Sequence, residues 1–195
     1  MTASARGAAL VDLLLACALA ALLAAVSIAA GSAARDRDEA RLAARYLASR
    51  LHAARVLALR QNAAVALRFN PDALDRVSVY VDGDGDGVQQ RDIDRGIDRL
   101  VEPETSLQDV FAGVTFRVRA AVPSPEGAGT IAADSDPLRI GNTNFVSFGP
   151  AGTATSGSLY LAGTRGPQVC LRIFGATGRL RVLWFDEARR TWRQD

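Results

Sequence analysis

The chain has 195 residues and a net charge of only +2, and all 23 of its basic residues are arginine. This balance excludes a protein that binds nucleic acid through its overall charge. The length suits one N-terminal anchor followed by one domain large enough to bury its own core. Cys17 lies in an apolar run and Cys170 in a mixed segment near the C-terminus, so we expect no disulfide between them.

The first predicted element is a long apolar run from Ala8 to Ala30, which directly follows Arg6 and Gly7. It contains one acidic residue, Asp12, near its start. A carboxylate at the centre of a bilayer costs about 2.5 to 3.5 kcal/mol, so an acid inside a membrane is a candidate functional residue. The run is long enough to predict a transmembrane helix.

Two other interpretations of this run remain open. A cleaved secretory signal would use Arg6, the apolar stretch Leu13–Val26 and the small residues of Ile28–Ala30. The acid at the start of the run argues against it. A lipoprotein signal would use Leu14–Cys17, but the chain stays apolar well beyond that cysteine.

The segment from Arg6 to Leu14 resembles the class III leader of type IV pilins and type II secretion pseudopilins, whose usual form is Gly-Phe-Thr-Leu-Val-Glu-Leu. Asp12 stands where that form has Glu, whereas Ala8 and Ala9 depart from the Phe-Thr pair. Four apolar positions also match: Leu10, Val11, Leu13 and Leu14.

The resemblance implies that a prepilin peptidase cuts after Gly7 and methylates the new amine of Ala8. It also implies that Asp12 pairs with the N-terminal amine of a neighbouring subunit as the helix enters a filament. The alternative is that Asp12 only reaches back to the cytoplasmic interface of the membrane.

The helical pattern continues past the apolar run. Residues 35–62 contain no Gly or Pro and are rich in Ala, Arg and Leu. One helix face carries apolar residues at i, i+4, i+7 and i+11: Leu47, Leu51, Ala54 and Ala58. We therefore predict a leader over residues 1–7, a transmembrane or filament-core helix over 8–31, its amphipathic continuation over 32–62 and a head domain over 63–195.

From Ala63 the hydrophobic period changes to two, which predicts strands. The predicted strands cover residues 65–69, 77–81, 114–118, 145–148, 159–161, 169–174 and 180–185. The fold class is α+β, with a long N-terminal helix packed on an antiparallel sheet. Together with the leader, this arrangement resembles that of the pilins.

The C-terminal half resembles the GspH/FimT pseudopilin domain at three segments in the same order: Phe148–Gly152, Gly157–Leu161 and Gly178–Arg181. The resemblance implies a minor pseudopilin of a type II secretion system, or a minor pilin of a type IV pilus, with a structural role. The implied partners are other pseudopilins or minor pilins, the prepilin peptidase and the assembly platform of the inner membrane. The implied location is the bacterial inner membrane, with a single span and the head in the periplasm.

Asp82, Asp84 and Asp86, with Gly87 at the sixth position, match the start of a calcium-binding loop. The twelfth position holds Ile93 instead of the glutamate that closes such a site. Calcium at the three aspartates is the one cofactor that the sequence suggests. The alternative is a loop that only turns the chain. A calcium-binding module released by signal peptidase is a third functional class for the chain.

The charges are unevenly distributed along the head. Residues 72–109 hold eleven acids and four arginines, whereas residues 165–195 hold seven arginines and three acids. One end of the domain is therefore expected to be cationic and another anionic.

Gly178–Arg181 matches the Gly-Arg-x-Arg motif that the FimT branch of the family associates with DNA capture in natural transformation. Arg179 and Arg181 lie two apart on a predicted strand and project from the same face. The alternative function is therefore a DNA-binding minor pilin whose arginines grip phosphates: Arg179, Arg181, Arg189 and Arg190. The simpler interpretation is that these arginines form a solvent-exposed strand face that binds no ligand.

The sequence offers no set of catalytic residues. His52 is the sole histidine and lies in the predicted helix. With one histidine and two distant cysteines, the chain lacks the parts of a catalytic triad or a zinc site. We therefore predict that the protein is not an enzyme.

Overall fold

The computed structural model describes residues 3–70, 72–164 and 168–194, and within these ranges the side chains of residues 3–12, 25–37 and 74 lie outside the described part. The chain divides into two compact units, residues 1–35 and 36–195. Helix α1 (Ala3–Gln61) contributes to both. Among the described residues, no helix is both long and apolar enough to cross a membrane.

In the second unit, α1 forms because a Gly- and Pro-free stretch places small and apolar residues on one face. The four residues predicted for this face are buried, with Leu47 and Ala54 only 2% and 3% exposed and Leu51 and Ala58 fully covered. The helix ends at Gln61, one residue before the predicted end, because Asn62 adopts a left-handed conformation with φ of 50°.

Sheet A has four antiparallel strands among the described residues, in the order β3-β2-β1-β8. These strands are β1 (Val65–Asn70), β2 (Ala73–Val81), β3 (Arg99–Ser106) and β8 (Phe145–Phe148). Val65 on β1 pairs with Val81 on β2 and with Phe148 on β8, so three buried side chains meet across the sheet. The alternation of apolar and polar residues along β1 and β2 produces this buried face.

Sheet B has the strand order β12-β11-β10-β9-β4 in the described part, and β7 also pairs with β9. Its strands are β4 (Val114–Phe116), β7 (Leu138–Arg139), β9 (Gly157–Gly163), β10 (Gln168–Phe174), β11 (Arg179–Asp186) and β12 (Thr191–Gln194). A separate hairpin pairs β5 (Val122–Pro123) with β6 (Thr130–Ile131). Two short helices, α2 (Gln90–Asp94) and α3 (Leu107–Val110), flank β3 in the sequence.

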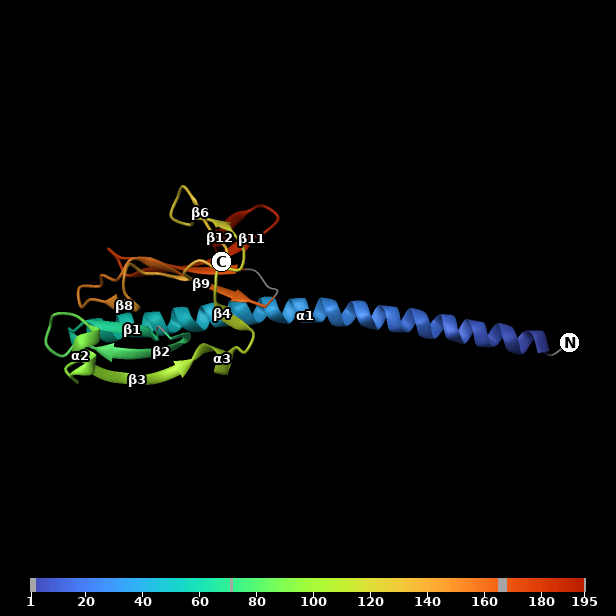
Figure 1. Cartoon of the computed structure of the whole chain (residues 1–195), viewed down its shortest axis with the longest axis horizontal. Coiled ribbons are helices and arrows are strands. Elements are labelled where there is room, and N and C mark those ends of the chain that lie inside the picture. The colour runs from blue at the N-terminus through green and yellow to red at the C-terminus, as the bar shows by residue number, and fades with distance from the viewer. Residues whose placement is uncertain (1–2, 71, 165–167, 195) are drawn as a thin grey trace. The chain divides into compact units, whose positions relative to one another are not determined.

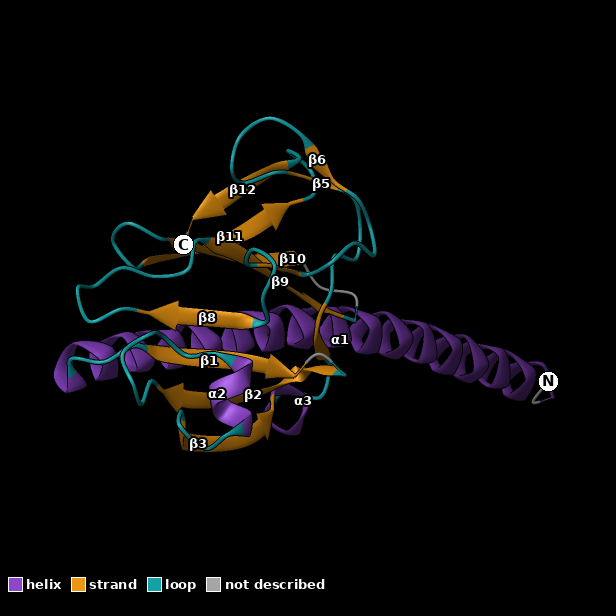
Figure 2. Ribbon diagram, turned by 60° about the vertical axis from the view of Figure 1, so that its left-hand side comes forward, coloured by secondary structure: helices purple, strands orange, loops and turns teal. Residues whose placement is uncertain are grey.

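The main hydrophobic core joins α1 to both sheets, and the C-terminal part of α1 runs between them (Figure 1). Small residues on the helix let the strands approach closely; Ala40, Ala43 and Ala44 are fully buried there. A second apolar cluster lies on the face of sheet B that points away from α1, where β5 and β6 lie beside the β11–β12 hairpin (Figure 2).

The predicted α+β class, with an N-terminal helix followed by antiparallel sheets, is confirmed. The seven predicted strands correspond to β1, β2, β4, β8, β9, β10 and β11. β3 was not predicted, because its residues are exposed on both faces apart from Ser106 and show no alternation. β3 also contains Pro103, which is tolerated there because β3 is the edge strand of sheet A.

Candidate functional site

The three residues predicted for processing and assembly belong to the first unit. The side chains of Gly7, Ala8 and Asp12 lie outside the described residues. Cleavage, methylation and the assembly contact therefore stay predictions based on the leader motif.

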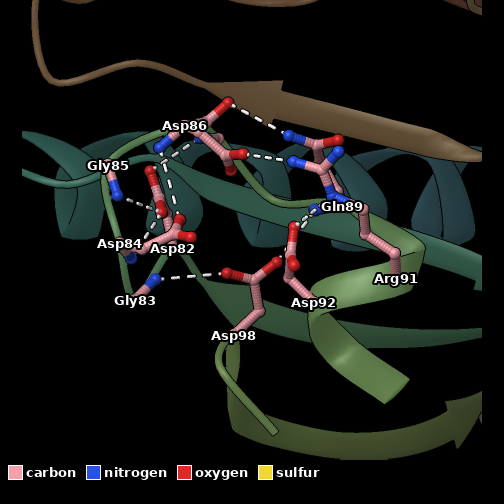
Figure 3. Close-up of polar contacts among 10 residues, drawn as sticks. Asp82, Gly83, Asp84, Gly85, Asp86, Gln89, Arg91, Asp92 and Asp98 are labelled. Atoms are coloured by element: carbon pink, nitrogen blue, oxygen red, sulfur yellow. Dashed lines mark hydrogen bonds and ion pairs between the residues drawn. The ribbon is translucent and has the colours of Figure 1, made fainter. Parts of the chain in front are cut away.

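The predicted calcium-binding segment forms a loop directly after β2, here called the acidic loop (residues 82–87). The Asp82 carboxylate organises this loop by accepting three backbone hydrogen bonds, from the N–H groups of Asp84 (3.1 Å), Gly85 (2.8 Å) and Gly87 (2.9 Å). Figure 3 shows Asp84 and Gly85 beside this carboxylate. Asp82 is only 9% exposed, so its charge is offset mainly by the loop's own N–H groups.

Asp98 holds the loop from the other side. Its Oδ1 accepts a hydrogen bond from the N–H of Gly83 at 3.1 Å, and its Oδ2 accepts one from the N–H of Gln89 at 2.8 Å (Figure 3). Asp98 is 3% exposed. Asp98 could not be recognised from the sequence, because nothing in the local pattern shows that it folds back on Gly83, 15 residues earlier.

Arginine 91 neutralises two further acids of this region. Arg91 on α2 donates to Asp86 at 2.5 Å and to the buried Asp92 at 3.0 Å. These contacts, led by the hydrogen bond to Asp92, raise the pKa of Arg91. Of the acids that flank position twelve, Asp92 thus faces Arg91, and Asp94 accepts a hydrogen bond from Gln90 at 2.7 Å.

The three predicted calcium ligands lie together, with carboxylate oxygens within 4.8 Å of one another. Asp84 and Asp86 are exposed. Desolvation is the largest cause of a raised pKa at Asp84; repulsion from Asp86 adds to it, whereas the N–H of Asp86 acts in the opposite direction. The spacing fits a small cation, but both oxygens of Asp82 already accept hydrogen bonds. Calcium binding stays a prediction.

Arg179 and Arg181 lie at the start of β11, next to Gly178, which closes the preceding turn with a φ of 58°. A Cβ atom at Gly178 would lie 2.7 Å from the carbonyl oxygen of Gly152 and 3.0 Å from Nε of Arg55. Gly178 is thus required for close packing between two loops and α1, in addition to the tight turn that the sequence predicted.

Both arginines belong to a group on the outer face of sheet B, here called the arginine block (Arg172, Phe174, Arg179 and Arg181). Arg172 lies opposite Arg181, and Phe174 lies opposite Arg179. The guanidinium carbons of Arg172 and Arg181 lie 5.6 and 5.2 Å from the centre of the Phe174 ring. Arg179 is exposed and Arg181 is half-buried.

Arg189 and Arg190 lie in the turn after β11, at the opposite end of the strand from Arg179. Asp186, at the end of β11, lies seven residues after Arg179, a distance of about 23 Å at 3.3 Å per residue. Arg189 and Arg193 lie 3.9 and 3.6 Å from Asp186. The structure thus brings Arg179 and Arg181 together but separates them from Arg189 and Arg190.

The tryptophans of β11 and β12, Trp184 and Trp192, are packed into the protein. Trp184 packs against the main core, and the guanidinium of Arg41 lies 5.4 Å from its ring centre. Trp192 donates from Nε1 to the carbonyl oxygen of Pro123 at 2.7 Å and contacts the ring of Phe185. Both side chains are therefore engaged in packing.

A comparison with family models identifies one that covers well over half of the chain. The model described as type II transport protein GspH matches residues 43–177. This range starts in α1 and ends in the turn before β11. No curated protein and no solved structure matches the chain.

Proposed function

Because this chain belongs to the type II transport protein GspH family, we propose that it is a minor pseudopilin, a structural subunit of a type II secretion system. The family match is the observation that carries this proposal. It covers most of the buried face of α1 and the strands from β1 to β10. A structural subunit needs a stable head attached firmly to its helix, and the core between α1 and both sheets meets this need.

The finer steps of the proposed function come from the leader motif. A prepilin peptidase removes residues 1–7 and methylates Ala8. The apolar part of α1 anchors the subunit in the inner membrane and then packs in the filament, where Asp12 meets the amine of a neighbouring subunit. The partners are the other pseudopilins, the prepilin peptidase and the assembly platform, and the head lies in the periplasm.

Mass spectrometry of the mature chain and a secretion assay in the native host test this function. We expect the mature chain to begin with methylated Ala8, and a Gly7→Val variant to keep its leader and to fail to restore secretion in a deletion strain. Asp12→Ala should be processed but fail to restore secretion, whereas Asp12→Glu should restore it. Asp38→Ala is the matched control, because it removes an exposed acid from the same helix.

Two results would contradict the proposal. A mature chain that begins near Gly31 would identify a product of signal peptidase. Full secretion in the deletion strain without any copy of the chain would exclude a role in secretion.

DNA capture at Arg179 and Arg181 is a second candidate function. The observation in its favour is that the two side chains share one strand face and have no carboxylate partner among the described residues. Changing both to Gln should weaken binding of duplex DNA, most strongly at low salt. Equal DNA affinity of the variant and the wild type would exclude this function for the pair.

A further inference from the structure

The arginine block contains an unfavourable pair of like charges. Arg172 and Arg181 are directly opposite each other on antiparallel strands, where like charges destabilise a sheet. Val169, Leu171 and Ile173 of β10 point into the main core, so Arg172 and Phe174 lie on the other face of sheet B. Such a pair is stable when anions reach that face.

The carboxylate of Glu126 already pairs with one arginine of this face. Oε1 of Glu126 accepts a hydrogen bond from Arg172 at 2.6 Å and another from the hydroxyl of Ser158 at 3.0 Å. Glu126 lies between β5 and β6, in the hairpin that covers this side of sheet B. The Arg172 side chain is 16% exposed, so its charge is largely offset inside the protein.

The second half of the block has no such partner. Among the described residues, no carboxylate pairs with Arg179 or Arg181. Nε of Arg181 is buried without a hydrogen-bond partner, and its guanidinium lies over Phe174. Arg179 and Arg181 thus have no carboxylate partner, and Arg181 lies over an aromatic ring, while the neighbouring Arg172 shows that a carboxylate fits this surface.

We propose that Arg179 and Arg181 dock a carboxylate-bearing segment of a partner subunit, and that Glu126 is an internal carboxylate that limits this docking by occupying Arg172. The inference rests on the proposed function, because the partner is another subunit of the same assembly. The segment is an acidic stretch of polypeptide whose side chains reach the guanidinium groups across the Phe174 ring.

The surroundings of the block favour an acidic polypeptide over DNA. A nucleic acid needs a continuous row of free cations to follow its phosphates. At the far end of β11, Arg189 and Arg193 share the single carboxylate of Asp186, Arg119 pairs with Glu187 at 2.9 Å, and Arg190 has no carboxylate partner among the described residues. Asp186 and Glu187 interrupt the positive surface there, so the arginine block suits one or two carboxylates better than a long polyanion.

Glu126 gives the proposal a specific signature. Replacing its carboxylate with an amide removes the negative charge that offsets Arg172, so the block then presents three arginines without a carboxylate partner to an incoming acid. Glu126→Gln should therefore increase the affinity for an acidic peptide about threefold, because the positive charge of the block rises by one. A residue with a purely structural role would not increase binding when it is changed.

Fluorescence anisotropy with the full-length chain in non-ionic detergent tests the proposal. The probe is a short fluorescein-labelled peptide of alternating Glu and Gly, compared with a Gln-Gly peptide and with labelled duplex DNA. The Glu-Gly peptide should bind, and the double variant Arg179→Gln/Arg181→Gln should lower its affinity about tenfold. The matched control is Arg95→Gln/Arg99→Gln, which removes the same charge from exposed sites and should leave affinity unchanged.

A charge-reversed variant covers the case in which the double Gln variant loses its fold. Arg179→Glu/Arg181→Glu should bind a Lys-Gly peptide in preference to the Glu-Gly peptide. The proposal is overturned by absence of Glu-Gly binding, by equal affinity of the control and double Gln variants, or by tighter binding of the duplex at the same arginines. None of these results affects the processing and secretion tests, so failure of this inference is distinct from failure of the proposed function.

Discussion

The acidic loop and the arginine block are two charged regions of the head, and they differ in how their charges are paired. At the acidic loop, Asp82 and the adjoining Asp98 accept five backbone hydrogen bonds between them. In the arginine block, Arg179 and Arg181 have no carboxylate partner among the described residues. The first set of charges maintains a backbone conformation, whereas the second is available to another molecule.

This difference shows that the ability of a charged motif to bind a ligand depends on which side chains and backbone groups already pair with it, and not on the spacing of its residues alone. The acidic loop has the more suggestive sequence, yet its most buried acid is engaged by its own backbone. The arginine block has a short and common motif, yet its charge is not balanced internally. Five measurements test this contrast.

The largest effect is expected for Asp82→Ala. The variant leaves three N–H groups of the acidic loop without their acceptor, so we expect a loss of about 3 kcal/mol in the free energy of unfolding. Asp84→Ala is the control, because the exposed Asp84 accepts only one long hydrogen bond of 3.4 Å, and it should change stability by less than about 0.5 kcal/mol. Urea unfolding measures both, and similar losses would show that overall charge organises the loop.

A glycine in each region separates backbone strain from close packing. Gly178→Ala should cost about 2 to 3 kcal/mol, because its φ of 58° is left-handed and the new Cβ meets the Gly152 carbonyl oxygen. Gly85→Ala should cost only about 1 kcal/mol, since its φ is 93° but no atom lies within 4 Å of the new Cβ. Thermal or urea unfolding compares them, and equal costs would show that the contact with Gly152 is not restrictive.

Removing a charge from the arginine block should have a small effect on stability. Arg181→Gln loses the contact with the Phe174 ring, worth about 0.5 to 1 kcal/mol, but relieves repulsion from Arg172 of similar size. We therefore expect a net change within about 0.5 kcal/mol in urea unfolding. A loss as large as that of Asp82→Ala would show that Arg181 has a structural role.

Lowering the pH should reduce the stabilisation that the Glu104 carboxylate gives to the folded head. Hydrogen bonds from Asn70 and then Arg76 lower the pKa of Glu104 below its usual 4.5. The unfolded chain therefore takes up this proton first, so the stabilisation is present above pH 4.5 and is lost as pH falls through the lowered pKa of the folded state. The difference in urea midpoint between the wild type and Glu104→Gln should shrink on acidification, and a constant difference would contradict this origin.

Calcium should produce the smallest effect, because the closing ligand of the loop is replaced by Ile93. Asp82, Asp84 and Asp86 should bind calcium weakly, with a small rise in melting temperature at millimolar calcium that chelator reverses. The control is Asp84→Asn/Asp86→Asn, which keeps the structural Asp82. No heat in calorimetry and unchanged melting would exclude a calcium site.

The elements that bury one face could be predicted from the sequence. The period of α1 identified Leu47 and Leu51, and alternation identified the strands that enter the core, because burial imposes these patterns. β3 has no buried face, so it left no pattern. The acidic loop and the Gly178 turn were recognisable because their residues are adjacent in the chain.

The side chains that pair with the charged residues of each site could not be predicted from the sequence. Glu126 lies 46 residues from Arg172 and reaches it only through the hairpin between β5 and β6. The separation of Arg189 and Arg190 from Arg179 depends on the length and direction of β11. These relations follow from the topology, and no local pattern encodes them.

The edge strand β3 of sheet A has features that disfavour pairing with a strand of another chain. Pro103 lacks an N–H group, so a strand laid against β3 would miss a hydrogen bond at that position. Charged residues flank the gap: Glu102, which pairs with Arg50, and Glu104, which pairs with Arg76. Pairing of a further chain with β3 is therefore disfavoured, and heads held close together gain protection from the edge-to-edge aggregation that an uncharged edge without proline would invite.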